Sequence, residues 1–255
     1  MRRYRYSFLI FGLMLTATIA AAASAAEAGD LDARALVNKA VQAHGGQAAL
    51  DKFPAFKAKL KGTLQLMGET VAFTVRLAAS GKDRQKLVIE AKAGDEKFVL
   101  VHVLNRDQGW TKINDDTEEM DKEDLAEARA EAYAEWVTTL APLKDKAFKL
   151  AFLSELKIDQ RPALGITVSK KGHRDVHLYF DKKTSLLVKT ETRVKDDNNN
   201  QEVTEETMLS NYKEVQGTKQ AMRFITRRDG KLYMEGEITE YVLAEKLDER
   251  TFAKP

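Results

Sequence analysis

One helical stretch interrupts a chain whose hydrophobic pattern otherwise alternates with the period of β-strands. In residues 121–140 the apolar side chains recur at the spacing of one helix face. These side chains are Leu125, Ala128, Ala132, Tyr133, Trp136, Val137 and Leu140. Asp121 suits the N-cap position, and Glu123 and Asp124 suit the positive end of the helix dipole. Pro142 ends the helix soon afterwards. A lone helix with an apolar stripe must bury that stripe against the sheet that the strands form.

Strands separated by clear turns make up most of the remaining chain. In residues 56–67 apolar side chains alternate with polar ones, which indicates a strand with one buried face. The same reading applies to residues 163–168, 175–180, 186–194, 203–214, 222–227 and 232–243. Residues 98–104 are apolar on both faces, which is typical of a central strand. We expect about 11–12 antiparallel strands, and a sheet of that size twists and curls. The predicted fold class is α+β, one strongly curved antiparallel sheet whose concave face is covered by helices.

A first helix is expected before the strands. It begins at Asp30 or Asp32, and His44-Gly45-Gly46 ends it with the glycine chemistry of a helix C-terminus. Its apolar stripe consists of Leu36, Val37, Ala40 and Val41.

The first 26 residues have the features of a signal peptide. A basic start, an apolar run over 8–23 and a small-residue cleavage site follow one another. The basic residues are Arg2, Arg3 and Arg5, and the cleavage site is Ala23-Ser24-Ala25. We therefore predict cleavage near residues 25–26, export to the periplasm, and one mature domain over 27–255. The other interpretation is an uncleaved signal anchor, although the apolar run is short for a membrane span.

Composition narrows the compartment and the partners. The chain has no cysteine, so it has no residue for amino-terminal lipidation or for a disulfide. The 41 lysines and arginines include the three arginines of the predicted signal peptide, and without them the basic residues are one fewer than the 39 acidic ones. The predicted mature chain is therefore nearly neutral, which argues against nucleic acid as a partner.

Short turn and packing motifs follow one another in a recognisable order. They are 41–50 (VQAHGGQAAL), Gly109-Trp110, Leu143-Lys144, 159–163 (DQRPA), Tyr179-Phe180-Asp181 with Thr184 and Leu187, 211–217 (NYKEVQG) and 252–255. The ordered set resembles the LolA/LolB-like superfamily of periplasmic lipoprotein carriers, and more closely its secreted outer-membrane lipoprotein-sorting relatives. Two departures are visible. The chain has Gln220-Ala221 where the relatives often carry a proline, and no residue matches the cavity arginine of the true carriers, since Arg76 and Arg84 fall on the polar face.

The resemblance implies an unclosed half β-barrel with helices as a lid over a hydrophobic cavity that takes up acyl chains. On that interpretation the cavity and lid residues are Leu60, Leu64, Leu66, Phe73, Val75, Leu77, Leu87, Ile89, Trp110, Tyr133, Trp136 and Leu140. The alternative is that the same side chains are ordinary core. Burying a large apolar side chain is worth roughly 1.5–3 kcal/mol in either case. The presence or absence of a cavity therefore separates the two interpretations.

No motif indicates a metal site or a catalytic centre. His173 and His177 are four residues apart, but on a strand that separates them by roughly 13 Å, too far to share one ion. The acidic run 115–124 lacks the glycine and the alternation of an EF-hand loop, so a solvated linker is expected there. The chain contains no Gly-x-Ser-x-Gly, His-Glu-x-x-His or phosphate-loop motif, and a triad assembled in space stays open. We expect no catalytic residue, metal or cofactor.

Three functions follow from these observations. The first is a non-enzymatic, monomeric periplasmic carrier whose partner is a lipid or an acylated lipoprotein. The second is an envelope module with a packed interior that binds another protein, for example at a sheet edge. The third is a small hydrolase or isomerase acting on a hydrophobic substrate, which requires polar groups that converge inside a cavity.

Overall fold

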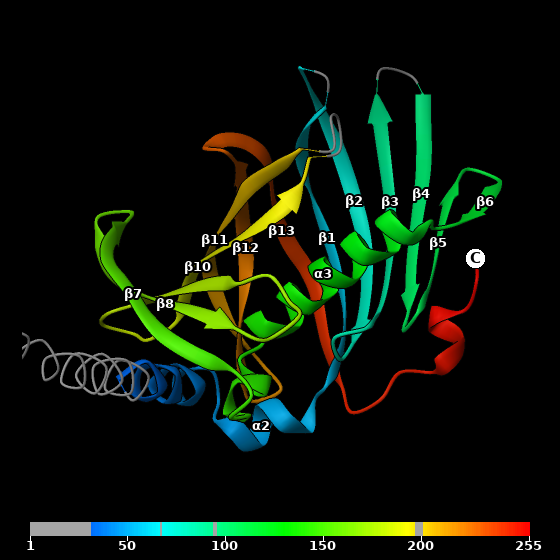
Figure 1. Cartoon of the computed structure of the whole chain (residues 1–255). Coiled ribbons are helices and arrows are strands. Elements are labelled where there is room, and N and C mark those ends of the chain that lie inside the picture. Colours follow the sequence, from blue (N-terminus) through cyan, green and yellow to red (C-terminus); the bar gives the residue numbers. More distant parts are fainter. Residues whose placement is uncertain (1–31, 67, 94–95, 197–200) are drawn as a thin grey trace, which may run out of the picture.

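An open, curved antiparallel sheet forms the frame of the protein (Figure 1). The structure is a computed structural model that describes residues 32–66, 68–93, 96–196 and 201–255, so the predicted signal peptide lies outside it. The described residues form one sheet of 13 strands in the order β6-β5-β4-β3-β2-β1-β13-β12-β11-β10-β9-β8-β7. The first six strands are β1 (Ala55–Leu66), β2 (Glu69–Ser80), β3 (Arg84–Ala93), β4 (Glu96–Asn105), β5 (Gln108–Ile113) and β6 (Asp116–Glu119). The others are β7 (Lys149–Ile158), β8 (Arg161–Ser169), β9 (Val176–Asp181), β10 (Leu187–Lys195), β11 (Glu202–Val215), β12 (Thr218–Arg228) and β13 (Lys231–Ala244).

The predicted fold class, an unclosed curved antiparallel sheet with few helices, is confirmed. β6 occupies part of the acidic run that the sequence suggested as a linker, and it forms one edge of the sheet. Because β7 is the opposite edge, the two ends of the sheet do not pair with each other.

The helix α3 (Lys122–Thr138) crosses the concave side because of this strand order (Figure 1). It connects β6 and β7, which lie at opposite edges, and its 17 residues span about 25 Å at 1.5 Å per residue. Asp121 is the N-cap, as predicted, and its carboxylate accepts hydrogen bonds from the backbone N–H groups of Glu123 at 2.8 Å and Asp124 at 2.9 Å. Pro142 lies in the 3₁₀ turn η1 (Ala141–Lys144), which follows directly.

One half of the concave side is a packed core. There the helix over 32–43 and the last turns of α3 cover β7 to β10. The buried members of this filled half include Val37, Ala40, Tyr133, Val137, Leu140, Phe148, Ile166, Val176, Leu178 and Phe180. The first turns of α3 are held by ion pairs instead, because Arg174 donates to both carboxylate oxygens of Glu127 at 2.7 and 2.8 Å. The backbone N–H of Lys195 adds a further hydrogen bond to Glu127 at 3.0 Å.

In the other half, β1 and β13 approach each other closely where two glycines pair. Gly62 on β1 lies opposite Gly236 on β13. A Cβ added to Gly62 would lie 2.0 Å from the carbonyl oxygen of Glu235, and one added to Gly236 would lie 2.9 Å from the Phe224 ring. The missing side chains let the two strands and the Phe224 ring come together on the concave side.

The C-terminal residues cover the convex side. Phe252 of η2 (Glu249–Phe252) is fully buried in a cluster with Val103, Trp110 and Leu247. Trp110 pairs across β4 and β5 with Val103, and Val103 pairs with Lys86 on β3, whose side chain points away from the concave face. Trp110, which the sequence suggested as a lid residue, therefore packs beneath the C-terminal tail.

Candidate hydrophobic binding cavity

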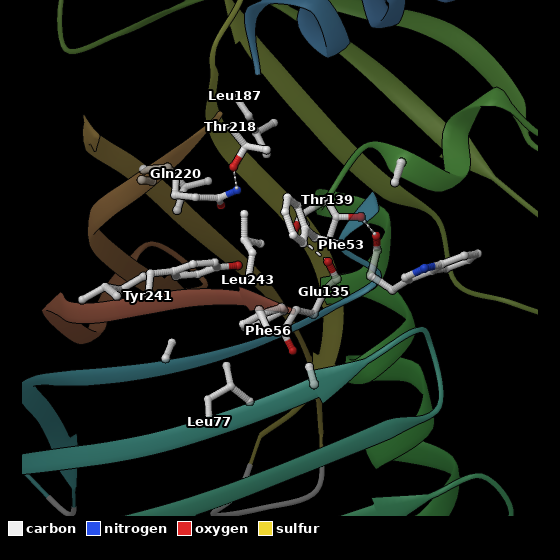
Figure 2. Close-up of a pocket in the computed structure, with 18 of the residues that line it drawn as sticks. Phe53, Phe56, Leu77, Glu135, Thr139, Leu187, Thr218, Gln220, Tyr241 and Leu243 are labelled. Carbon is white, nitrogen blue, oxygen red and sulfur yellow. Dashed lines mark hydrogen bonds between the residues drawn. The ribbon is translucent and has the colours of Figure 1, made fainter. Parts of the chain in front are cut away.

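A cavity of about 610 Å³ lies between the second half of the concave face and the C-terminal half of α3. Its walls come from β1, β2, β3, β11, β12 and β13, and its cover comes from α3 (Figure 2). The helix α2 (Gln47–Lys52) and η1 close one end. Most of the lining side chains are apolar, and the volume lies within the roughly 300–1,000 Å³ that is usual for small-molecule sites.

The strand register arranges this wall in rows that cross β13, β1, β2 and β3 in that order. Row 1, nearest to α2, is Leu243, Phe56, Ala79 and Gln85, and row 2 is Tyr241, Ala58, Leu77 and Leu87. Row 3 is Ile238, Leu60, Val75 and Ile89, and row 4 is Gly236, Gly62, Phe73 and Ala91. Polar side chains occur only in the first two rows. The rows extend over about 20 Å, since Phe56 and Gly62 are six residues apart on one strand.

The structure brings most of the sequence-predicted cavity residues together. Those that line the cavity are Leu60, Phe73, Val75, Leu77, Leu87, Ile89 and Trp136. Leu64 packs against the same apolar cluster beyond row 4. The side chain of Leu66 lies outside the part of the chain that the structure describes. Tyr133 and Leu140 belong to the filled half, and Trp110 to the convex side.

The wall contributed by β12 and β13 was not predicted from the sequence. It includes Phe224, Met234, Ile238, Tyr241 and Leu243. The pairing of β1 with β13 shifts between Lys59 and Leu60, so that Glu240 and Ile238 face consecutive residues and Thr239 is extra. This bulge changes the alternation, so Ile238 and Tyr241 both face the cavity although they are three positions apart. A strict two-residue period therefore misplaces half of this strand.

An acidic side chain joins the lining from the cover. Glu135 on α3 accepts a hydrogen bond at Oε2 from Nε2 of Gln85 in row 1, and no lysine or arginine of the described residues pairs with it. Burial raises the pKa of Glu135 to about 7, and the Gln85 hydrogen bond offsets only part of that effect. Burial and the negative charge of Glu135 also raise the pKa of Tyr241, whose side chain enters the same space (Figure 2).

Replacing Glu135 with glutamine is expected to stabilise the protein by about 1–3 kcal/mol near pH 8 and to have little effect near pH 4. The pKa of about 7 in the folded protein exceeds the ordinary value of 4.5, so the folded state keeps a proton that the unfolded chain releases between these values. The unaltered protein therefore loses stability as the pH rises through this interval, and the variant does not lose it through this group. Urea unfolding at both pH values measures the difference.

Glu131→Gln is the matched control for this prediction. Glu131 lies one turn earlier on α3 and is exposed, so its loss should change stability little at either pH. An equal stabilisation by Glu135→Gln at both pH values would contradict the assignment of a raised pKa to Glu135.

The end of the first helix forms part of the cavity floor. The buried His44 ring lies with Nδ1 2.7 Å from the Ala40 carbonyl oxygen, and Nε2 accepts a hydrogen bond from the Leu187 backbone N–H at 3.5 Å. Burial lowers the pKa of His44, which keeps the imidazole neutral. Gly45 has a φ of 116°, and a Cβ there would lie 2.3 Å from the carbonyl oxygen of Gly217. The motifs 41–50 and 211–217 are thus in direct contact, and they are structural.

Charged side chains at the cavity rim have partners of opposite charge. Lys144 bonds to Asp51 at 2.6 Å, and Lys219 bonds to Glu214 at 3.2 Å. The Arg84 guanidinium donates to Glu249 of η2 at 2.8 Å. Each of these three cations at the rim is therefore neutralised by a carboxylate.

The two histidines that the sequence spaces four residues apart contact different partners. The His173 ring stacks on Tyr133 with a centroid separation of 3.8 Å, while His177 Nδ1 lies 3.2 Å from Glu191. No group of three or more His, Cys, Asp or Glu side chains in the described ranges is arranged to hold a metal ion. Nor does the described part of the chain contain a helix with the length and apolarity needed to cross a membrane.

Comparisons with known proteins identify the fold. No family model matches the sequence, and no curated protein matches it. An outer membrane lipoprotein-sorting protein domain from Vibrio parahaemolyticus is similar with a TM-score of 0.56 and 14% identity over 90% of this chain and 97% of that chain. A LolA superfamily protein from Nitrosomonas europaea has a TM-score of 0.54 and 12% identity over 87% of this chain and 97% of that one. A DUF1329 family protein from Desulfovibrio piger has a TM-score of 0.55 and 11% identity with the same coverage. The chain therefore has the fold of the LolA superfamily, as its motifs indicated.

Proposed function

We propose that this protein is a non-enzymatic periplasmic carrier that binds a lipid or the acyl chain of a lipoprotein. The observation that carries the proposal is the apolar cavity of about 610 Å³. Leu60, Leu77 and Leu87 stay half-buried beneath α3 although they lie on the covered face of the sheet. Binding of an apolar chain in this space is favourable, because it removes the exposed apolar surface of both the cavity and the chain from water.

The fold and the amino-terminal residues support the same class of function. The similar structure from Vibrio parahaemolyticus is described as a lipoprotein-sorting domain, and the predicted signal peptide over 1–26 directs the chain to the periplasm. One chain supplies the walls, the floor and the cover of the cavity, so the proposed functional unit is a monomer.

The other two functions receive less support. An envelope scaffold with a packed interior does not need an open cavity of this size. An enzyme needs polar groups that can act together, and the interior does contain Glu135. His44, however, uses both ring nitrogens in contacts with the backbone of Ala40 and Leu187, so it has no nitrogen left to serve as a general base.

The carrier proposal is tested by looking for its ligand. Protein isolated from the periplasm should release a lipid on solvent extraction, detected by mass spectrometry. The delipidated protein should bind N-phenylnaphthylamine, a neutral dye that fluoresces in apolar sites, and fatty amphiphiles should displace it. A folded protein, verified by circular dichroism, that yields no lipid and binds no dye would contradict the proposal.

A further inference from the structure

The wall that β13, β1, β2 and β3 form becomes less polar from one end to the other. Row 1 contains Gln85 and row 2 contains Tyr241, whereas the side chains of rows 3 and 4 are apolar. Phe224 and Met234 extend the apolar end. An elongated amphiphile would therefore place its chain over rows 3 and 4 and its head near row 1 and α2.

Polar atoms at the head end remain available for hydrogen bonds. Glu135 Oε2 is occupied by Gln85, but Oε1 has no hydrogen-bond partner among the described residues. The Tyr241 ring stacks on Phe56 with a centroid separation of 5.0 Å, and its hydroxyl makes no hydrogen bond within the described chain. Both groups line the cavity, and Figure 2 shows them on opposite sides of the same space.

The charge at this end is negative. The cations nearest the rim, Lys144, Lys219 and Arg84, form ion pairs with carboxylates. No cation of the described residues pairs with Glu135. An anionic head would meet the Glu135 carboxylate without compensation, whereas a donor head would complete its hydrogen bonding.

We propose that Glu135, Gln85 and Tyr241 form the head-group site of the cavity, and that this site selects an amphiphile whose uncharged head donates a hydrogen bond, such as a hydroxyl or a primary amide. This inference rests on the proposed carrier function. It adds the orientation of the ligand and the chemical class of its head.

The test compares three amphiphiles that share one chain and differ in the head. Palmitamide, cetyl alcohol and palmitate, each kept below the concentration at which it aggregates, compete with N-phenylnaphthylamine for the delipidated protein. Near pH 8, where Glu135 is mostly ionised, the amide and the alcohol are expected to bind about tenfold more tightly than palmitate. In Glu135→Gln this preference should fall below about threefold, and in the control Glu131→Gln it should persist. Tyr241→Phe should weaken the binding of the amide and of the alcohol.

Each result either supports or overturns the inference. Because the preference is measured first in the unaltered protein, it does not depend on the folding of any variant. Equal affinities for the three amphiphiles overturn the head-group site and leave the carrier function standing. A preference that survives Glu135→Gln overturns the role of Glu135. Failure of the dye and of all three amphiphiles to bind overturns both the inference and the proposed function.

Discussion

Replacing Leu140 with alanine is expected to lower the free energy of unfolding by about 2–5 kcal/mol. Replacing Trp136 with alanine should lower it by only about 1–2 kcal/mol and should weaken ligand binding. Leu140 is fully buried in the filled half of the concave side. Trp136 is half-buried, lines the cavity, and keeps part of its packing against Phe148 at a centroid separation of 6.0 Å. The two side chains lie on one helical stripe but cover different spaces.

Urea unfolding and dye affinity, measured on both variants, separate the two effects. Leu140 has a left-handed φ of 65°, and alanine there keeps the same backbone preference as leucine, so the comparison reports the side chain. A Trp136 variant that loses as much stability as the Leu140 variant, with unchanged dye affinity, would indicate that α3 only fills the sheet.

The helix α3 and the residues that follow it have two roles on the concave side. Their stripe fills the sheet over β7 to β10 through Tyr133, Val137 and Leu140. The neighbouring positions Glu135 and Trp136 cover an open space instead. Helical periodicity identifies the face of the helix that is turned away from solvent, but it does not show whether packed side chains or a cavity lie beneath that face. For the same reason Glu135, which is not part of the apolar stripe, borders the cavity.

The sequence predicted the wall residues on regularly paired strands and missed those on the strand that contains a bulge. β1, β2 and β3 pair without a register shift, so a period of two correctly placed Leu60, Val75 and Ile89 on one face. β13 contains the bulge at Thr239, and a bulge has no sequence signal as clear as a turn. The residues that β13 contributes could be found only once the register was known.

Contacts between residues far apart in the sequence were the other feature that local sequence patterns could not predict. Trp110 and Phe252 are more than a hundred positions apart, and their contact decides that Trp110 faces the convex side. An aromatic side chain on an alternating strand is equally compatible with either face until its partner is known. The capping of α3 by Asp121, by contrast, depends on neighbours in sequence and was predicted correctly.

Leu87→Trp is expected to weaken N-phenylnaphthylamine binding about tenfold. The double variant, in which Leu77 is also replaced with tryptophan, should weaken this binding about a hundredfold. The two leucines are direct cross-strand neighbours in row 2, so both indoles would enter the same section of the cavity. Stability should change by less than about 1.5 kcal/mol, because the rings fill open space and do not displace packed side chains.

Val88→Trp is the matched control, since the next residue on β3 points to the opposite face of the sheet. It adds the same ring to the same strand outside the cavity and should leave dye affinity unchanged. Equal loss of binding in the Val88 and Leu87 variants would mean that distortion of β3 is responsible. Because only the side-chain direction differs between these two positions, a loss confined to Leu87 and Leu77 would locate the ligand on the concave face beneath α3.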